Sequence, residues 1–198
     1  MIARAGKVAK RSFDIFFSFL GILCFSPIIF VAWFIASIET RSNGFFCQKR
    51  VGMNGALFKL YKIKTMKTMP NIDSKITTLN DPRITSFGYY FRRYKIDELP
   101  QLFNVLIGEM SFVGPRPDVP GFADKLSGRE KKILSIRPGI TGPASLKYRN
   151  EETILMNQKN PEKYNREVLW PDKVKINLDY IDNWTLKKDL IYIFKTLL

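Results

Sequence analysis

The chain has 198 residues, of which 45% are hydrophobic, so it can build one domain and, at most, an appended element. Its 32 Lys and Arg residues outnumber 18 Asp and Glu residues, and a net charge of +14 calls for an anionic partner: nucleic acid, an anionic membrane face or a phosphorylated substrate. The chain contains no histidine, which excludes a histidine general base and a Ser-His-Asp triad.

The first predicted element is an apolar helix over residues 15–38, a run without a charged side chain that is long enough to cross a bilayer core. It is too long for a signal peptide and lacks a small-residue cleavage site, so we expect it to remain as an anchor. Ser26-Pro27 lies in its middle. The proline removes a helical N–H and kinks the helix, and the Ser26 hydroxyl can bond a freed carbonyl.

Basic side chains flank this segment on both sides, in residues 4–11 and in residues 41–50. The positive-inside rule therefore gives no direction for a crossing, whereas a bent helix that enters and leaves the same cytoplasmic face satisfies both flanks. We expect residues 1–39 to form a basic N-terminus with a re-entrant membrane helix, and residues 40–198 to form a compact cytosolic domain. A straight spanning helix with a tolerated proline is the alternative.

Apolar and polar residues alternate in residues 44–52 and 57–64, on either side of a turn with Gly and Asn, which predicts a β-hairpin. Residues 66–80 are polar and contain proline, so we expect a loop there. Residues 86–94 read as a helix with Arg92 near its C-terminal end, where a cation is favourable. The predicted fold class is therefore α/β, mainly helical with a short β-hairpin.

Two adjacent carboxylates, Asp97 and Glu98, come just before the next helical pattern, which ends at Gly108. Its apolar residues recur at helical spacing and read as a core stripe: Leu99, Leu102, Phe103 and Leu106. Asp and Glu favour the first turn of a helix, so a capped, solvated helix start is the plain interpretation. An aspartate can also act as a nucleophile toward phosphorus. Without histidine, Asp97-Glu98 is the best-placed candidate for chemistry.

Gly114-Pro115-Arg116-Pro117 cannot be a central helix or strand, because its two prolines remove two N–H donors. Their fixed φ angles hold Arg116 in one pose. The guanidinium of a stiff, unpaired arginine can bind phosphate oxygens in a bidentate way, through two N–H groups at once. Residues 137–143 form a second proline-containing, turn-rich loop that carries an arginine, Arg137. Either loop can equally be a mere turn.

The last predicted helix has one apolar face: Leu186, Leu190, Ile191, Phe194, Leu197 and Leu198. Lys187, Lys188 and Lys195 lie elsewhere on this helix. Such a basic amphipathic helix suits a membrane interface. A helix packed on the domain core explains the pattern equally well.

Taken together, these motifs resemble the bacterial sugar transferases, the small monotopic phosphoglycosyl transferases that start the assembly of surface polysaccharides and glycoproteins. The resemblance covers essentially the whole chain. The matching segments are residues 10–14, Ser26-Pro27 and residues 46–52, 61–66, 81–85, 97–105, 110–117 and 137–142. Each segment alone is weak, but their order and joint presence are specific. The chain looks like the minimal catalytic form of the family.

The resemblance implies that a sugar 1-phosphate passes from a UDP-sugar to polyprenol (undecaprenyl) phosphate, with release of UMP. It implies a covalent phosphosugar–aspartyl intermediate on Asp97, with Glu98 as the dyad partner and with Mg²⁺ near Asp97. The implied substrate-phosphate-binding residues are Lys64, Thr65, Arg92, Pro115, Arg116 and Pro117. Arg149 and Asp179 match further active-site positions in a more variable region of the family.

The implied location is the cytoplasmic face of the bacterial inner membrane, where a soluble donor and a lipid acceptor can both reach the dyad. A homodimer is left open. The alternative function is a non-enzymatic, membrane-tethered basic module that binds anionic lipid or nucleic acid. That alternative gives no reason for Asp97-Glu98 beside a Pro-clamped arginine, and the aromatic residues lie mostly in apolar runs rather than on a basic stacking face. We therefore expect no nucleic-acid partner.

Overall fold

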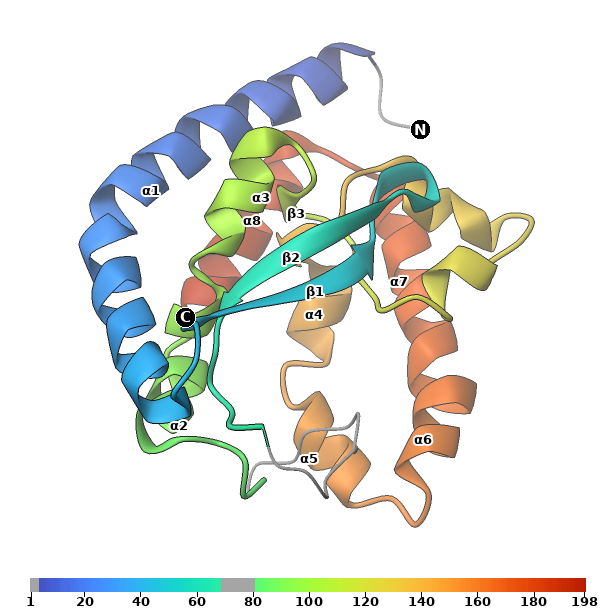
Figure 1. Ribbon diagram of the computed structural model, residues 1–198. Helices are drawn as coiled ribbons and strands as arrows, with labels where there is room; N and C mark the ends of the chain where they lie inside the picture. Colours follow the sequence, from blue (N-terminus) through green and yellow to red (C-terminus); the bar gives the residue numbers. More distant parts are fainter. Residues whose placement is uncertain (1–3, 69–80) are drawn as a thin grey trace.

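The computed structural model describes residues 4–68 and 81–198. The helices and strands of these residues are α1 (Arg4–Thr40), β1 (Phe45–Val51), η1 (Met53–Gly55), β2 (Leu57–Ile63), α2 (Ser86–Arg93), η2 (Ile96–Glu98), α3 (Gln101–Ile107), β3 (Ser111–Val113), η3 (Ala123–Lys125), η4 (Glu130–Ser135), β4 (Gly139–Thr141), α4 (Pro143–Lys147), α5 (Glu151–Met156), α6 (Pro161–Tyr164), η5 (Asn165–Leu169), α7 (Trp170–Asp182) and α8 (Leu186–Leu197). Figure 1 shows α1 bent around the outside of the molecule, the β1–β2 hairpin across its middle, and α7 on the far side from α1. The mainly helical fold with a short hairpin is confirmed.

The predicted hairpin forms from β1 and β2, which pair antiparallel along their whole length. Side chains of β2 alternate between the two faces of the hairpin, as a strand requires. Phe58 and Leu60 are buried and pack with Val105 and Met110, whereas Lys59 is exposed. One face of β2 therefore lies against the domain. Of the predicted loop over residues 66–80, residues 69–80 lie outside the described residues.

Both helices predicted around the dyad form. Thr85 caps α2 by accepting a hydrogen bond from the backbone N–H of Gly88. Gly108 ends α3 with φ 93°, in the left-handed region that favours glycine. Arg11 and Arg137 donate hydrogen bonds to carbonyls at this C-terminal end. Arg137 thus stabilises the end of α3 through Nε, and no described contact brings it to Asp97 or Glu98.

The prediction of a turn-rich loop over residues 137–143 is wrong in part, because β4 forms inside it. Strands β3 and β4 pair in parallel, with Ser111 opposite Gly139. A Cβ added at Gly139 would lie only 2.1 Å from the backbone nitrogen of Gly114, so this approach requires glycine. Both strands are very short and distant in sequence, so no local pattern predicts them. Their pairing places the two proline-containing loops side by side.

Helix α1 is long and apolar enough to cross a membrane, and only 17% of its most apolar stretch is buried in the molecule. Pro27 lies inside the helix. The Ser26 hydroxyl donates a hydrogen bond to the carbonyl of Leu23, at 3.1 Å. Because that carbonyl lies four residues before the proline, it is the one that Pro27 leaves without an N–H partner. The predicted bond at the helix break is therefore confirmed.

Pro27 divides α1 into a first arm, residues 4–26, and a second arm, residues 28–40. Both arms pack against the same domain. In the first arm, Asp14 is buried and accepts a hydrogen bond from the Ser111 hydroxyl of β3, at 3.1 Å. In the second arm, Ala32 and Ala36 are buried in a cluster that includes Phe91 of α2. The bent helix therefore begins and ends on the domain rather than leading away from it (Figure 1).

Helix α8 forms as predicted and packs on the domain through a different face from the one that the sequence singled out. Asp189 is buried, and Tyr192 and Ile193 pack against the largest core cluster. On the predicted apolar face, Leu190 is 48% and Phe194 69% exposed. Core packing and an exposed apolar stripe thus occur together on one helix.

Candidate active site

The dyad lies on η2, a short turn between α2 and α3. Lys95, just before it, has φ 57° and ψ 20°, a left-handed conformation that is uncommon for a residue with a side chain. After this sharp turn, the side chains of Asp97 and Glu98 both face inward. Asp97 is 8% exposed, and the Glu98 side chain is 12% exposed. The interpretation of Asp97-Glu98 as a solvated helix start is therefore wrong.

Two cations meet the carboxylate of Glu98. Lys62 Nζ lies 2.8 Å from Glu98 Oε1, and Arg116 Nη2 lies 3.1 Å from the same oxygen. Burial of Glu98 opposes its ionisation, but Arg116 and Lys62 together hold the pKa of this carboxyl well below its ordinary value. Glu98 is therefore ionised at neutral pH. Arg116, expected to be unpaired, is paired with the dyad itself.

The carboxylate of Asp97 is much less engaged. Its Oδ2 lies 4.0 Å from Lys62 Nζ, and its buried Oδ1 has no hydrogen-bond partner among the residues that the structure describes. Burial raises the pKa of Asp97, Lys62 opposes the rise, and the neighbouring charge of Glu98 adds to it. Lys95 and Arg92 also favour the ionised form. Asp97 thus presents an unpaired oxygen in a strongly cationic environment.

This unpaired oxygen fits a magnesium ligand. Mg²⁺ binds proteins through one or two carboxylates and completes its shell with waters and substrate phosphates. Within residues 4–68 and 81–198, no group of three or more His, Cys, Asp or Glu residues could hold a metal. A cation at Asp97 would therefore depend on the substrate for most of its remaining ligands.

The loop that carries Arg116 is fixed at both prolines. The carbonyl of Pro115 accepts a hydrogen bond from the backbone N–H of Gly139, at 2.8 Å. The carbonyl of Pro117 accepts one from Arg50 Nη1, at 3.1 Å. Strand β4 and the end of β1 therefore hold the loop that carries Arg116 in place beside the dyad.

Three more predicted phosphate ligands lie on α2 or directly after β2. Arg92 is near enough to favour the ionised form of Asp97, and its Nη2 lies 2.9 Å from Glu152 Oε1 of α5. Lys64 donates through Nζ to the hydroxyl of Ser42, at 2.7 Å. Thr65 is buried beside the start of α2. Of these three residues, Arg92 acts on the charge of Asp97, and no described hydrogen bond or ion pair joins any of the three to the dyad.

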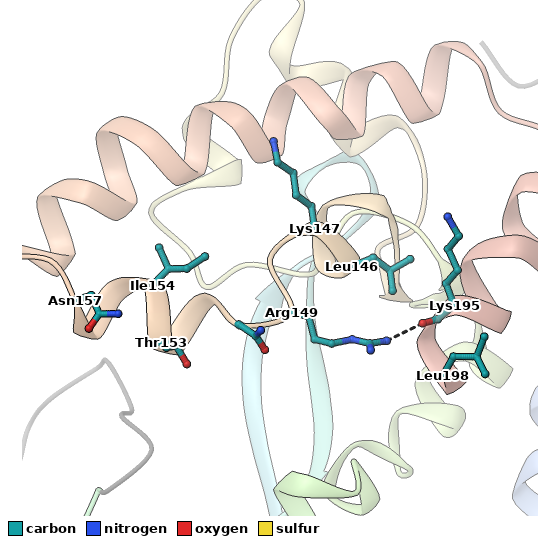
Figure 2. A pocket seen from close by; sticks show the side chains of 9 residues that line it. Leu146, Lys147, Arg149, Thr153, Ile154, Asn157, Lys195 and Leu198 are labelled. Carbon is teal, nitrogen blue, oxygen red and sulfur yellow. Dashed lines mark hydrogen bonds between the residues drawn. The ribbon is translucent and has the colours of Figure 1, made fainter.

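Arg149 and Asp179 lie elsewhere. Arg149 follows α4, and its Nη2 donates to the carbonyl of Lys195 at 2.7 Å, near the end of α8 (Figure 2). Asp179 lies on α7 and accepts a hydrogen bond from Asn183 at 2.8 Å. No described contact brings either residue to Asp97 or to Glu98.

The sequence reasoning missed Lys62, although the pattern contained a signal. In β2 the alternation of side chains places Lys62 on the same face as the buried Phe58 and Leu60. A lysine on the inward face of a strand needs an anionic partner. Lys62 finds that partner in the dyad.

Asp118 is a second residue that the sequence reasoning missed. It directly follows Pro117 in the loop that carries Arg116. The other charged residues that act on it are Arg50, Arg116, Glu151 and Lys173. Burial raises the pKa of Asp118 to about 6, while the three cations work against that rise. Perturbed carboxyl groups of this kind concentrate at functional sites. Asp118 therefore extends the charged region beyond the dyad.

Buried carboxylates among fixed cations define a site for anionic, phosphate-containing substrates. Comparison with known proteins agrees with that class. The profile of the family described as bacterial sugar transferase matches residues 5–198. The chain belongs to this family and is a transferase. An enzyme of this kind is not the non-enzymatic module considered as the alternative.

Similar proteins bear specific names. The chain is 31% identical to exopolysaccharide production protein ExoY of Sinorhizobium fredii, over 97% of this chain and 85% of that protein. It is 36% identical to an undecaprenyl-phosphate glucose phosphotransferase of Komagataeibacter xylinus, over 95% of this chain and 35% of the relative. It is 32% identical to an undecaprenyl-phosphate galactose phosphotransferase of Salmonella typhimurium, over 98% of this chain and 40% of the relative.

Proposed function

We propose that this chain transfers a sugar 1-phosphate from a UDP-sugar to undecaprenyl phosphate, through a covalent phosphosugar–aspartyl intermediate on Asp97. The observation that supports this most strongly is the unpaired, buried Oδ1 of Asp97 beside a Glu98 already paired with two cations. Two of the similar proteins are named as undecaprenyl-phosphate sugar phosphotransferases, which supports the acceptor. The donor follows from the resemblance of the motifs.

In the first step, a carboxylate oxygen of Asp97 attacks the sugar-linked phosphorus of the donor. A bond forms between that oxygen and phosphorus, the bond to the bridging oxygen breaks, and UMP leaves with the bridging oxygen. In the second step, a phosphate oxygen of the acceptor attacks the same phosphorus. The bond to Asp97 breaks, the carboxylate is regenerated, and polyprenyl diphosphate sugar is released.

Positive charge makes this attack feasible, because a carboxylate and a diphosphate repel each other. Arg116 and Lys62 are fixed by Glu98, so their charges need little reorganisation when the phosphoryl group is transferred. Arg92 adds charge from α2. Asp97 would hold Mg²⁺, which when bound neutralises charge on the donor phosphates.

For the membrane, we propose that α1 is re-entrant and that residues 40–198 form a catalytic domain on the cytoplasmic face of the bacterial inner membrane. Two observations support this: both arms of α1 contact the same domain, and the proline break lies between them. The exposed apolar stripe of α8 suits a helix at the membrane interface. A soluble donor and a lipid acceptor would then meet at the dyad.

The test is UMP release by the purified, membrane-reconstituted chain, given undecaprenyl phosphate and a panel of UDP-sugars that includes UDP-glucose and UDP-galactose. Asp97→Asn should lose both UMP release and covalent labelling by the donor, and Glu98→Gln should lose most turnover. Glu130→Gln, a change at an exposed carboxylate, is the matched control and should be as active as wild type. Normal turnover in Asp97→Asn would end the mechanism, and full activity in excess EDTA would remove magnesium from it.

A further inference from the structure

A separate cavity of about 750 Å³ lies between the α4–α5 segment and the end of α8. Its size is typical of ligand-binding pockets. The residues that line it are Leu146, Lys147, Arg149, Asn150, Thr153, Ile154, Asn157, Lys195 and Leu198. Figure 2 shows Arg149 extended across the pocket toward α8. We call it the α5–α8 pocket.

The lining of the α5–α8 pocket is cationic. Among residues 4–68 and 81–198, the lining includes Lys147, Arg149 and Lys195 and no Asp or Glu. Lys147 is partly neutralised by Asp172, at 2.6 Å. Arg149 uses Nη2 to hold the carbonyls of Lys195 and Thr196, and no other guanidinium nitrogen has a hydrogen bond among the described residues. The ammonium of Lys195 likewise has none there. The pocket therefore offers unused donors to an anion.

One wall of the pocket is apolar and continues onto the surface. Leu146, Ile154 and Leu198 contribute apolar side chains to the lining. One and two turns before Leu198 on α8, Phe194 is 69% and Leu190 48% exposed. An anion with a long apolar tail could place its charge in the pocket and its tail along α8. A free nucleotide would make no use of that surface.

The pocket also adjoins the dyad region through α5. Asn150, just before α5, and Thr153, within it, line the pocket. Between them on the same helix, Glu152 is paired with Arg92, and Glu151 is near enough to Arg116 to act on its charge. A ligand in the pocket therefore lies across one short helix from the cations of the dyad.

We propose that the α5–α8 pocket is the docking site of the lipid acceptor, where a polyprenyl phosphate binds through its phosphate and its first prenyl units before it reaches Asp97. This rests on the proposed function for the identity of the acceptor. It adds a place for that acceptor, distinct from the dyad, and it assigns the phosphate to Lys195 and Arg149.

The test is binding without turnover. Undecaprenyl phosphate, the neutral alcohol undecaprenol and UDP are titrated separately onto the detergent-solubilised full chain. Lys195→Glu reverses the free cation, and Thr153→Trp fills the pocket without a change of charge. Lys187→Glu makes the same charge change on the exposed surface of α8, outside the pocket, and is the matched control. Thermal melting of each variant shows whether the fold is retained.

Loss of one charge-assisted contact corresponds to about a tenfold weaker Kd for undecaprenyl phosphate in Lys195→Glu. Thr153→Trp should weaken it similarly, whereas Lys187→Glu should leave it unchanged. Lys195→Glu should leave the binding of undecaprenol unchanged, and no variant should alter the binding of UDP. Equal weakening by Lys187→Glu, or weakening of UDP instead of the lipid, overturns the proposal. Because no turnover is needed, a chain that binds the lipid here but releases no UMP would refute the proposed reaction and keep the pocket.

Discussion

Lys62 and Arg116 make the two carboxylates of the dyad chemically unequal. Both cations contact one oxygen of Glu98, and the pKa of this carboxyl is lowered accordingly. Asp97 has only the more distant Lys62 contact, and burial raises its pKa. Environments that push two pKa values apart assign different roles to the two groups. Glu98 is the fixed anchor of the cations, and Asp97 keeps an oxygen for bond formation.

Replacing Lys62 should therefore weaken catalysis more than folding. Lys62→Met keeps the length of the side chain and removes the charge, which leaves Glu98 with Arg116 alone. The loss of a hydrogen bond to a charged group, about 1.5–3 kcal/mol, corresponds to a roughly 10- to 100-fold slower release of UMP. Lys59→Met, on the exposed face of the same strand, should retain activity. Equal activity of the two variants would remove Lys62 from the mechanism.

Asp118 predicts a specific pH dependence of stability. Burial raises its pKa to about 6 in the folded chain, above the ordinary value of 3.8. The folded state therefore binds this proton more tightly than the unfolded state, and the resulting stabilisation, complete below pH 3.8, is lost as the pH rises through 6. Asp118→Asn keeps the uncharged form at every pH. Its melting temperature relative to wild type should rise between pH 4.5 and pH 7, and a constant difference across that range would contradict the prediction.

At the scale of elements, a buried ion pair joins the first arm of α1 to α8. Lys10 Nζ lies 2.5 Å from Asp189 Oδ2, and both side chains are almost fully buried. Tyr180 and Trp184 also donate hydrogen bonds to the Asp189 carboxylate. Helices α1 and α8 are therefore held together by one buried polar network with satisfied hydrogen bonds, and breaking it should loosen both helices.

Lys10→Met tests this network. Removing one partner of a buried pair leaves the other charge unpaired, which typically costs about 3–5 kcal/mol. We expect a large fall in melting temperature, partly recovered when Asp189→Leu is added. Lys7→Met, one turn earlier at an exposed position, should melt like wild type. If both single variants melt alike, the pair does not hold the two helices together.

Local signals in the sequence were sufficient for some elements and insufficient for others. The alternation in β1 and β2 and the Gly108 stop act within a few residues, and β1, β2, α2 and the end of α3 lie close to their predicted bounds. The β3–β4 pair depends on a contact between Ser111 and Gly139, which no local pattern carries. For α8, one apolar face was found in the sequence, but Asp189 on the other face makes the buried contact.

The candidate site shows the same division. Asp97, Glu98 and Arg116 were chosen from motifs, and the structure brings the three together. The pairing of Arg116 was not foreseen, because it joins residues from separate loops. Lys62 was missed for the same reason, since its role becomes visible only when β2 is placed beside η2.

For the whole molecule, the contacts of α1 set a geometric condition on its path through the membrane. In a spanning orientation Lys10 would lie across a hydrocarbon core about 30 Å thick from the second arm of α1. The Lys10–Asp189 pair and the bond between Asp14 and Ser111 would then be broken. The re-entrant path keeps both contacts, and the basic residues on either side of the apolar segment agree with that path.

Cysteine labelling tests this topology. In a background with Cys24→Ala and Cys47→Ala, single cysteines replace Ala5 and Ser42, which are both exposed. An impermeant maleimide should label neither position in intact spheroplasts and both in inverted vesicles, because both flanks share the cytoplasmic side. Pro27→Leu restores the missing helical N–H and should straighten α1, so that a fraction of molecules exposes position 5 outside. Adding Lys10→Met should enlarge that fraction, since it removes the contact that holds the first arm on the domain. External labelling of position 5 with Pro27 and Lys10 intact would establish a spanning helix and refute re-entry.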